Sequence, residues 1–318
     1  MRALVLDGAP RLDRAFPDPE RKPGEAIVDV LVAGVCDTDL QLARGYMGFR
    51  GVPGHEFVGR VRESDDPRWI GKRVVADINA GCGACDECRE RAGHHCGART
   101  VLGILARSGA FADRLSIPER CLVEVPDDVS DDRAVFAEPL AAALHVLDDA
   151  SWLEASDRAV VLGDGKLGQL IARALAGVGH RVVMVGRHER KLAMIRSAGV
   201  EALLEGQTGL LPRSRLVVDA TGSASGLALA MKLTAPRGTI VLKTTVAGAL
   251  EIDLSPLVID EIRLVGSRCG DMHRAVDVLT RRQVDPLPLV EARYPLDEAA
   301  DAIAHAGRKG SMKVLVDV

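Results

Sequence analysis

The chain has 318 residues, a length that predicts two domains when one domain takes roughly 100–200 residues. Apolar residues make up 47% and charged residues 27%, and the formal net charge is −4, so we expect an ordinary globular protein. The charge offers no basic face, and 3% aromatic residues offer little base-stacking surface, which together exclude a typical nucleic-acid-binding protein.

The first residues, 1–8, and the cysteine content bear on location. Their apolar stretch is too short for a signal peptide, and no run of 18 apolar residues predicts a membrane-spanning helix. We therefore expect a cytoplasmic protein with no membrane partner. In that reducing compartment, seven cysteines indicate metal ligands or reactive thiols before disulfides.

Residues 1–125 predict a β-rich domain. They are rich in Gly and Pro, and short β-branched runs such as 26–32 and 73–76 alternate with turn residues. A junction that contains Pro126 follows, and residues 131–149, which are dense in Ala and Leu, predict helices.

A loop rich in Gly, Asp and Arg carries four cysteines in the spacing C-x2-C-x2-C-x7-C: Cys82, Cys85, Cys88 and Cys96. The loop has little apolar surface to fold on, and four thiolates bind zinc tetrahedrally with no open position, so the spacing predicts a structural zinc. Free thiols are one alternative. An iron–sulfur cluster is another, but its bacterial pattern ends C-x3-C-P, whereas Gly97 follows Cys96 here. His94 and His95 are interpreted as bystanders beside a complete ligand set.

The second half of the chain alternates between strand and helix patterns. The continuous apolar run 159–162 predicts a buried parallel strand, and apolar residues at helical spacing predict a helix over 166–178. Further strands are expected at 181–185, 216–220, 239–242 and 262–265. This alternation predicts a doubly wound parallel sheet. The run 313–316 reads as a strand that periodicity alone does not place.

A G-x-G-x-x-G motif follows the first of these strands and opens the helix; its residues are Gly163, Asp164, Gly165, Lys166, Leu167 and Gly168. The first glycine permits a tight turn, the second lets a pyrophosphate approach the backbone, and the third lets helix and strand pack closely. The motif therefore predicts a dinucleotide site, against the alternative of an ordinary glycine-rich turn.

The end of the next strand bears on cofactor choice. An NAD site would carry Asp or Glu there, whereas Gly186 and Arg187 stand there and Glu189 is the nearest acid along the sequence. Arg187 could pair with a 2′-phosphate, so NADP(H) is favoured over NAD(H). The alternative is that Arg187 is a solvated loop residue.

Two upstream segments, 34–39 (GVCDTD) and 54–59 (GHEFVG), contain Cys36 and His55. Alone, each could be a residue of the apolar core. Together with the four-cysteine lobe, 137–140 (AEPL), the glycine motif and 218–222 (VDATG), they make the whole chain resemble the zinc-containing medium-chain dehydrogenase/reductase family, which includes alcohol, polyol and threonine dehydrogenases.

The resemblance implies a fold and an assembly. It implies a GroES-like, β-rich catalytic domain over 1–139 and 268–318, with the zinc lobe at about 81–97, and a Rossmann domain over 140–267. It further implies two zinc ions per chain, one catalytic and one structural, a small-molecule substrate, and a homodimer or homotetramer.

The resemblance also implies a catalytic zinc held by Cys36 and His55. The third ligand is a carboxylate, with Glu138 favoured and Glu56 exchanging on and off the metal or holding its water, as in polyol, glucose and threonine dehydrogenases. Asp39 is expected to accept a hydrogen bond from the other nitrogen of His55 and so to fix its tautomer.

The mechanism that follows from this resemblance is hydride transfer between a carbinol carbon and the nicotinamide. Zinc acts as a Lewis acid on the substrate oxygen, and Thr38 takes the hydroxyl proton. The cofactor is expected at the glycine motif, Gly186, Arg187 and Thr221. Many family members have a histidine where Gln41 stands, so the proton must leave by water, the cofactor ribose or another group, or the enzyme works mainly as a reductase.

Other residues have two interpretations. The segment that contains Tyr46, Met47, Phe49 and Arg50 either lines the substrate cleft, with Arg50 a weak hint of an anionic substrate, or is a surface loop. Lys313 either approaches the cofactor phosphates or is a solvated lysine at a strand end.

Cys121 and Cys269 show no metal spacing and are interpreted as structural. The alternatives for the whole protein are a zinc-free enone or quinone reductase and a non-catalytic NADPH-binding protein.

Overall fold

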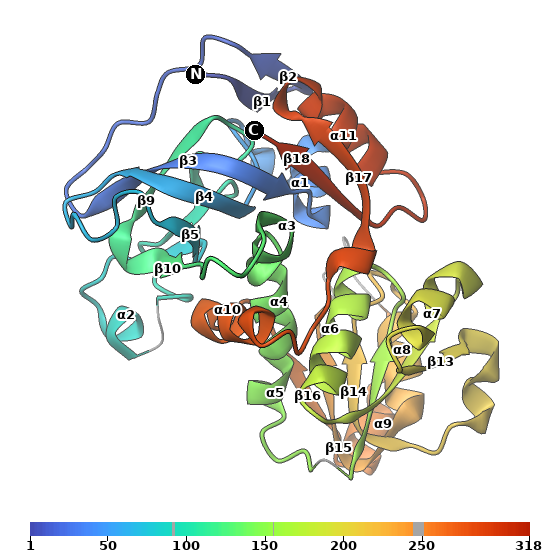
Figure 1. The fold of residues 1–318 in the computed structure, drawn as a ribbon. Coiled ribbons are helices and arrows are strands. Elements are labelled where there is room, and N and C mark those ends of the chain that lie inside the picture. Colours follow the sequence, from blue (N-terminus) through green and yellow to red (C-terminus); the bar gives the residue numbers. More distant parts are fainter. Residues whose placement is uncertain (91–92, 155, 244–250) are drawn as a thin grey trace. The chain divides into compact units, whose positions relative to one another are not determined.

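The computed structural model describes residues 1–90, 93–154, 156–243 and 251–318 (Figure 1). The chain forms two compact units. The first contains Met1–Glu138, Met272–Arg281 and Pro286–Val318, and the second contains Pro139–Asp271 and Arg282–Asp285. Both marked chain ends lie in the first unit (Figure 1).

The first unit is built on a seven-stranded sheet in the order β10-β5-β4-β3-β18-β17, with β9 paired to β3. The strands are β3 (Glu25–Gly34), β4 (Glu56–Glu63), β5 (Arg73–Ala76), β9 (Arg114–Pro118), β10 (Leu122–Glu124), β17 (Val290–Pro295) and β18 (Lys313–Asp317). The predicted β-rich character of this region is confirmed. Strand β3 is almost continuously apolar and buried, which suits a central strand.

The structure places residues 313–316, whose position periodicity alone does not predict, in strand β18. It pairs antiparallel with β3, where Leu315 faces Gly34, and parallel with β17. Strand β18 therefore lies inside the first unit's sheet, between β3 and the edge strand β17, beside the segment that contains Cys36.

Two smaller sheets and a set of short helices complete the part of the first unit that the structure describes. The sheets are β1 (Ala3–Asp7) with β2 (Ala9–Asp13), and β6 (Asn79–Ala80), β7 (Thr100–Leu102) and β8 (Ala106–Arg107). The helices that matter for the site are α1 (Asp37–Ala43), η1 (Tyr46–Gly48), α2 (Asp86–Glu90), α3 (Asp131–Ala134), α10 (Met272–Thr280) and α11 (Ala299–Ala306). Helix α4 (Ala137–Leu144) begins in this unit, whose first segment ends at Glu138, and continues in the second unit.

The second unit is a six-stranded parallel sheet in the order β13-β12-β11-β14-β15-β16. Its strands are β11 (Arg158–Leu162), β12 (Arg181–Gly186), β13 (Glu201–Leu204), β14 (Ser214–Asp219), β15 (Thr234–Leu242) and β16 (Arg263–Gly266). The chain order reverses between β11 and β14, the position where open parallel sheets bind ligands at the carboxyl ends of their strands. The predicted alternation is confirmed.

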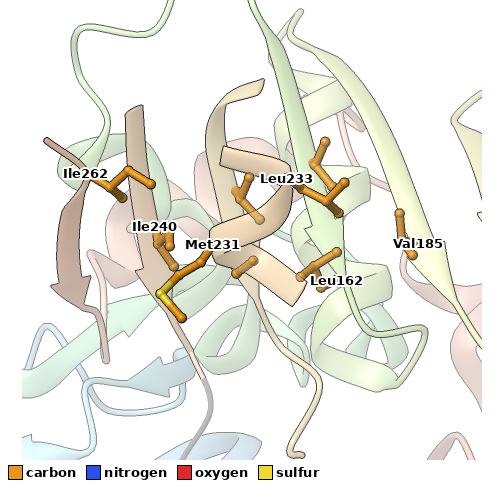
Figure 2. Packing of buried hydrophobic residues seen from close by; sticks show 9 residues of the cluster. Leu162, Val185, Met231, Leu233, Ile240 and Ile262 are labelled. Carbon is orange, nitrogen blue, oxygen red and sulfur yellow. The ribbon is translucent and has the colours of Figure 1, made fainter. Parts of the chain in front are cut away.

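Helices connect these strands: α5 (Val146–Asp149), α6 (Lys166–Gly177), α7 (Glu189–Arg196), η3 (Glu205–Leu210), α8 (Gly226–Leu233) and α9 (Ser255–Ile259). Figure 2 shows Met231 and Leu233 of α8 packed with Leu162 and Ile240 of the sheet, in a cluster of buried apolar side chains. Among the residues that the structure describes, none of the helices is both long enough and apolar enough to cross a membrane.

Candidate metal and cofactor sites

Three potential metal ligands meet in the first unit. Cys36, His55 and Glu56 each offer one ligand atom, and these atoms all lie within 4.8 Å of one another. Cys36 follows β3 and His55 precedes β4, and these strands pair with Gly34 opposite Glu56, so the sheet register brings the segments together. Gly34 is required here, because a Cβ atom at that position would overlap the Glu56 carboxylate. His55 and Glu56 are buried and Cys36 is partly exposed.

The buried carboxylate of Asp39 holds two of these segments in place. Its Oδ2 accepts a hydrogen bond from the backbone N–H of Cys36 at 2.8 Å, which also caps helix α1. Its Oδ1 accepts the backbone N–H of Gly54 at 3.1 Å and lies 3.4 Å from Nδ1 of His55. Asp39 is therefore placed to orient the imidazole of His55 and leave the other ring nitrogen for a metal.

The electrostatics of the cluster favour a bound cation. Burial lowers the pKa of His55, but the nearby Asp39 carboxylate and Cys36 sulfur outweigh it and raise the pKa well above its ordinary value. A thiolate, an imidazole and a carboxylate are all zinc ligands, so the side chains present fit that metal.

Lys313 differs from both sequence-based interpretations. It is buried, its Nζ forms an ion pair with Glu56, and it donates a hydrogen bond to the carbonyl of Val35 at 3.3 Å. The interpretation of a solvated strand-end lysine is wrong, because β18 lies inside the sheet and the Lys313 side chain is buried. Burial lowers the pKa of Lys313, but the Glu56 carboxylate raises it above the ordinary value, so the lysine is a cation beside the cluster.

Glu138 and Thr38 lie near this cluster but outside its three-residue set. Burial raises the pKa of Glu138 to about 7, His55 opposes that rise, and the neighbouring Glu56 carboxylate adds to it. The Oγ1 atom of Thr38 lies 3.9 Å from Sγ of Cys36. Gln41 is exposed on helix α1.

The segment around η1 is largely exposed. Tyr46 and Met47 are 56% and 57% exposed, and Arg50 forms an ion pair with Asp7 at 2.9 Å. The charge of Arg50 is therefore already compensated, and the interpretation as a surface loop fits better than a hint of an anionic substrate.

The four-cysteine lobe brings its sulfur atoms to zinc-binding distances. The Sγ atoms of Cys85 and Cys88 lie 3.5 Å apart, those of Cys85 and Cys96 3.7 Å, and those of Cys82 and Cys88 3.9 Å. A tetrahedral site with Zn–S bonds of about 2.3 Å places its sulfurs about 3.8 Å apart. All four thiols are free of disulfides, so the arrangement fits one tetrahedral zinc. Cys121 is buried, which raises its pKa to about 12 and suits a structural thiol.

The dinucleotide motif joins β11 to α6 in the second unit. Gly163 has a φ of +104°, and a Cβ atom there would lie 2.5 Å from the carbonyl oxygen of Ala220. A Cβ atom at Gly168 would overlap the carbonyl of Gly163, so only glycine lets helix and strand approach this closely. Gly165 precedes Lys166 and Leu167 in the first turn of α6, whose free N–H groups can bind phosphate.

An acid from the glycine motif, Asp164, lies against the carboxyl end of β12, and sequence spacing did not predict this position. Oδ2 of Asp164, from within the glycine motif, accepts the backbone N–H groups of Arg187 and His188, each at 2.7 Å. A Cβ atom at Gly186 would lie 2.5 Å from that oxygen, so the acid of an NAD site does not fit there while Asp164 is in place. An acid between two motif glycines is the sequence signal that could have revealed it.

Arg187 is also paired. Its Nε donates to Oε2 of Glu205 at 2.5 Å, and its Nη2 donates to Oγ of Ser225 at 3.0 Å. Glu189, the nearest acid along the sequence, pairs with Arg196, and the acids that lie beside Arg187 are Asp164 and Glu205. Thr221 follows β14 and accepts the N–H of Ser223 at 3.2 Å, near Gly163.

Comparisons with known proteins match this geometry. The family model of the alcohol dehydrogenase GroES-like domain matches residues 22–127, and that of zinc-binding dehydrogenase matches residues 167–281. The 2-dehydro-3-deoxy-L-galactonate 5-dehydrogenase of Pseudoalteromonas atlantica is 28% identical over 314 residues, which cover 92% of each chain.

Two solved structures are similar over the full chain. An alcohol dehydrogenase from Escherichia coli CFT073 complexed with NADH has a TM-score of 0.90 at 25% identity, covering 100% of this chain and 99% of its own. A zinc-binding dehydrogenase from Sinorhizobium meliloti bound to NADP has a TM-score of 0.90 at 27% identity with the same coverage. The predicted combination of a GroES-like unit with a Rossmann unit is confirmed, and the chain belongs to the zinc-type alcohol and polyol dehydrogenases of the medium-chain dehydrogenase/reductase family, a family of oxidoreductases.

Proposed function

We propose that this chain is a zinc-dependent, NADP(H)-preferring dehydrogenase that transfers a hydride between the nicotinamide and a small alcohol or polyol, or the corresponding aldehyde or ketone. The observation that carries the proposal is that one ligand atom each of Cys36, His55 and Glu56, two of them buried residues, lie within 4.8 Å of one another. A zinc-free enone or quinone reductase would have no use for this ligand set.

Cys36 and His55 would hold the catalytic zinc, with Glu138 as third ligand and Glu56 as an exchanging or water-holding partner. The ion pair with Lys313 supports this division, because it already compensates the charge of Glu56. Glu138, whose pKa is raised to about 7, is the carboxyl that would gain most from a cation. When bound, zinc supplies a Lewis acid that polarises the substrate oxygen and lowers the pKa of the alcohol.

The residues of the chain would then divide the remaining work. Thr38 would accept the hydroxyl proton and pass it towards solvent, and Asp39 would keep the imidazole of His55 in one orientation. Gln41 carries no titratable group, so the proton would leave through water or the cofactor ribose. The lobe would hold a second, structural zinc through Cys82, Cys85, Cys88 and Cys96.

Selection of NADP(H) is supported by the end of β12. No side chain fits at position 186 while Asp164 is in place, and both carboxylate oxygens of Asp164 face backbone or imidazole donors. Arg187, which directly follows β12, is the cation that would meet a 2′-phosphate. The comparable structure from Sinorhizobium meliloti, which was solved with NADP, supports the same proposal.

The substrate class and the location are inferred from the relatives and the thiols. The relative from Pseudoalteromonas atlantica is named for oxidation at a sugar-acid carbon, which supports a polyol or sugar-acid hydroxyl as the substrate group here. Four thiols held within 3.5–3.9 Å must stay reduced to bind zinc, which supports residence in the cytoplasm.

A homodimer or homotetramer is proposed from the edge strand β16. In the described part of the sheet β16 pairs only with β15 and its Leu264 is 40% exposed, and Val258 and Ile259 of the preceding helix α9 are 79% and 78% exposed. An apolar sheet edge of this kind invites pairing with a second copy. Light scattering should report more than one chain per particle, and Leu264→Glu should lower that number; a monomeric native protein would contradict the assembly.

The test of the function combines metal analysis with a substrate panel. We expect about two zinc atoms per chain, following the ligand counts, and chelator-sensitive turnover of alcohols, polyols or aldehydes with NADP(H). Cys36→Ser should remove one zinc and the activity, and Cys82→Ser should remove the other. A single zinc that survives Cys36→Ser and is lost in Cys82→Ser would overturn the catalytic site.

A further inference from the structure

We propose that Glu205 sets how strongly this chain prefers NADPH over NADH, because it occupies the edge of the Arg187 guanidinium that a 2′-phosphate needs. The inference rests on the proposed function and names a selectivity residue that sequence spacing does not reveal. Glu205 would act as a built-in competitor of the phosphate rather than as a ligand of the cofactor.

The geometry shows which donors are taken. Glu205 holds Arg187 side-on, with Oε2 at 2.5 Å from Nε and Oε1 at 3.4 Å from Nη2. The same Nη2 donates to Ser225 at 3.0 Å. Nε and Nη2 form one of the two edges with which arginine grips phosphate by paired hydrogen bonds, so a phosphate that used this edge would have to displace the carboxylate.

The position of Arg187 leaves it few other arrangements. Asp164 fixes the backbone N–H groups of Arg187 and His188, and β12 is aligned with β13 so that Gly186 faces Leu204. Glu205 follows Leu204 directly, so the sheet register sets the two charged side chains side by side at the carboxyl ends of neighbouring strands.

The ion pair lies on a hollow. A depression of about 470 Å³ is lined by Arg187, Leu204, Glu205 and Gly206. The side chains of Arg187 and Glu205 are 55% and 39% exposed, and ion pairs at such exposure contribute at most about 1 kcal/mol. A phosphate with a charge of about −1.5 to −2 can therefore displace a carboxylate of charge −1 at modest cost.

After a 2′-phosphate has displaced Glu205 from Arg187, the Glu205 charge still weakens the binding of NADPH and not that of NADH. Once released, the Glu205 carboxylate stays near the 2′-phosphate and repels it, whereas NADH has no phosphate and leaves the ion pair intact. Glu205 should therefore weaken NADPH binding and leave NADH binding nearly unchanged.

The experiment compares NADPH and NADH dissociation constants, measured by fluorescence titration, for the wild-type full chain and for Glu205→Gln. We expect Glu205→Gln to tighten NADPH about fivefold, the factor that corresponds to the upper value for such a pair, and to change NADH less than twofold. Glu205→Ala, which removes the hydrogen-bonding group as well, should act in the same direction. Glu189→Gln is the matched control, because that acid belongs to the same region but pairs with Arg196.

Arg187→Ala provides the second arm. It should weaken NADPH selectively, and adding Glu205→Gln to Arg187→Ala should tighten NADPH less than Glu205→Gln does alone, because only the repulsion remains to be relieved and no guanidinium edge is freed. If both cofactors bind the wild type and neither Glu205 variant shifts the NADPH-to-NADH ratio more than Glu189→Gln does, the inference is overturned and the proposed function stands. If the wild type binds neither cofactor, the proposed function itself fails.

Discussion

At the scale of single residues, the candidate metal site and the candidate cofactor site each contain a charged side chain that is paired with an opposite charge. Lys313 compensates Glu56 in the first unit, and Asp164 and Glu205 bracket Arg187 in the second. Lys313 on β18 and Glu56 on β4 lie on either side of β3, and Arg187 and Glu205 follow the neighbouring strands β12 and β13, so the fold and not the sequence brings these charges together.

Replacing Lys313 with Met should be strongly destabilising. The side chains of Lys313 and Glu56 are 5% and 1% exposed, and removing one partner of such a pair typically costs about 3–5 kcal/mol because the other charge stays buried. Urea unfolding of the metal-free chain measures this loss. The exposed Lys309→Met is the control, expected within about 0.5 kcal/mol of wild type. The double variant Lys313→Met/Glu56→Gln should recover part of the stability, and a Lys313 effect no larger than the control would contradict the pairing.

Asp164→Asn should make stability depend differently on pH. Burial raises the pKa of Asp164, but hydrogen bonds from His188 and the backbone N–H of Arg187 outweigh it, so the folded-state pKa lies below the ordinary value of 3.8. The carboxylate therefore stabilises the fold above about pH 4, and the gain is lost as the pH falls through the folded-state pKa. The variant should lose about 1 kcal/mol at pH 7, and the gap to wild type should narrow in acid. A gap that is constant from pH 7 to pH 3 would show that the charge is not responsible.

Sequence reasoning found the ligand-type residues and missed their charged partners. The four lobe cysteines have a local spacing that predicts a metal site, whereas the metal role of Cys36 and His55 followed only from the resemblance of the whole chain to a family. Lys313 lies 257 positions from Glu56, so no window of sequence could join them. Its predicted alternatives assumed a strand end at the surface, and only the pairing of β18 with β3 placed it inside.

At the scale of elements, sequence periodicity predicted the strands and helices better than it predicted the charged partners of single residues. The parallel strands of the second unit are continuous apolar runs, which periodicity identifies well, and the predicted helix at 166–178 is α6 within one residue of its end. Short elements without periodicity, such as η1 and η3, depend on tertiary contacts and were not predicted.

The lobe should depend on one glycine. A Cβ atom at Gly81 would lie 2.6 Å from Sγ of Cys88, so Gly81→Ala must push a proposed zinc ligand aside. We expect the variant to bind about one zinc fewer per chain, because a structural site needs all four ligands. Metal analysis by mass spectrometry checks this. Gly97→Ala, where a Cβ atom meets open space, is the matched control, and equal zinc content in both variants would argue against the lobe site.

The whole molecule consists of two units with separate ligand chemistry. All the proposed metal ligands lie in the first unit, and the glycine motif with Arg187 and Glu205 lies in the second. The division follows the hydrophobic cores, which sequence patterns outline, whereas the return of β17 and β18 to the first unit's sheet is a long-range pairing that no local pattern reveals.

Thermal unfolding should therefore separate into two transitions. A chelator should lower the transition of the first unit, and NADPH at about 100 times its dissociation constant should stabilise the second by about 2.7 kcal/mol. Scanning calorimetry with each addition in turn measures both shifts. One shared transition that responds equally to chelator and cofactor would contradict this separation.

The position of β18 inside the sheet has a consequence for folding during synthesis. Ribosomes synthesise the chain from its amino terminus, so β3 is made long before its partner strand β18. The pairing of Leu315 with Gly34 cannot form until residues 313–317 have been synthesised. Until then the sheet has an open edge, and Glu56 has no Lys313 to neutralise it. A nascent chain stalled before residue 313 should thus expose this open edge and bind chaperones.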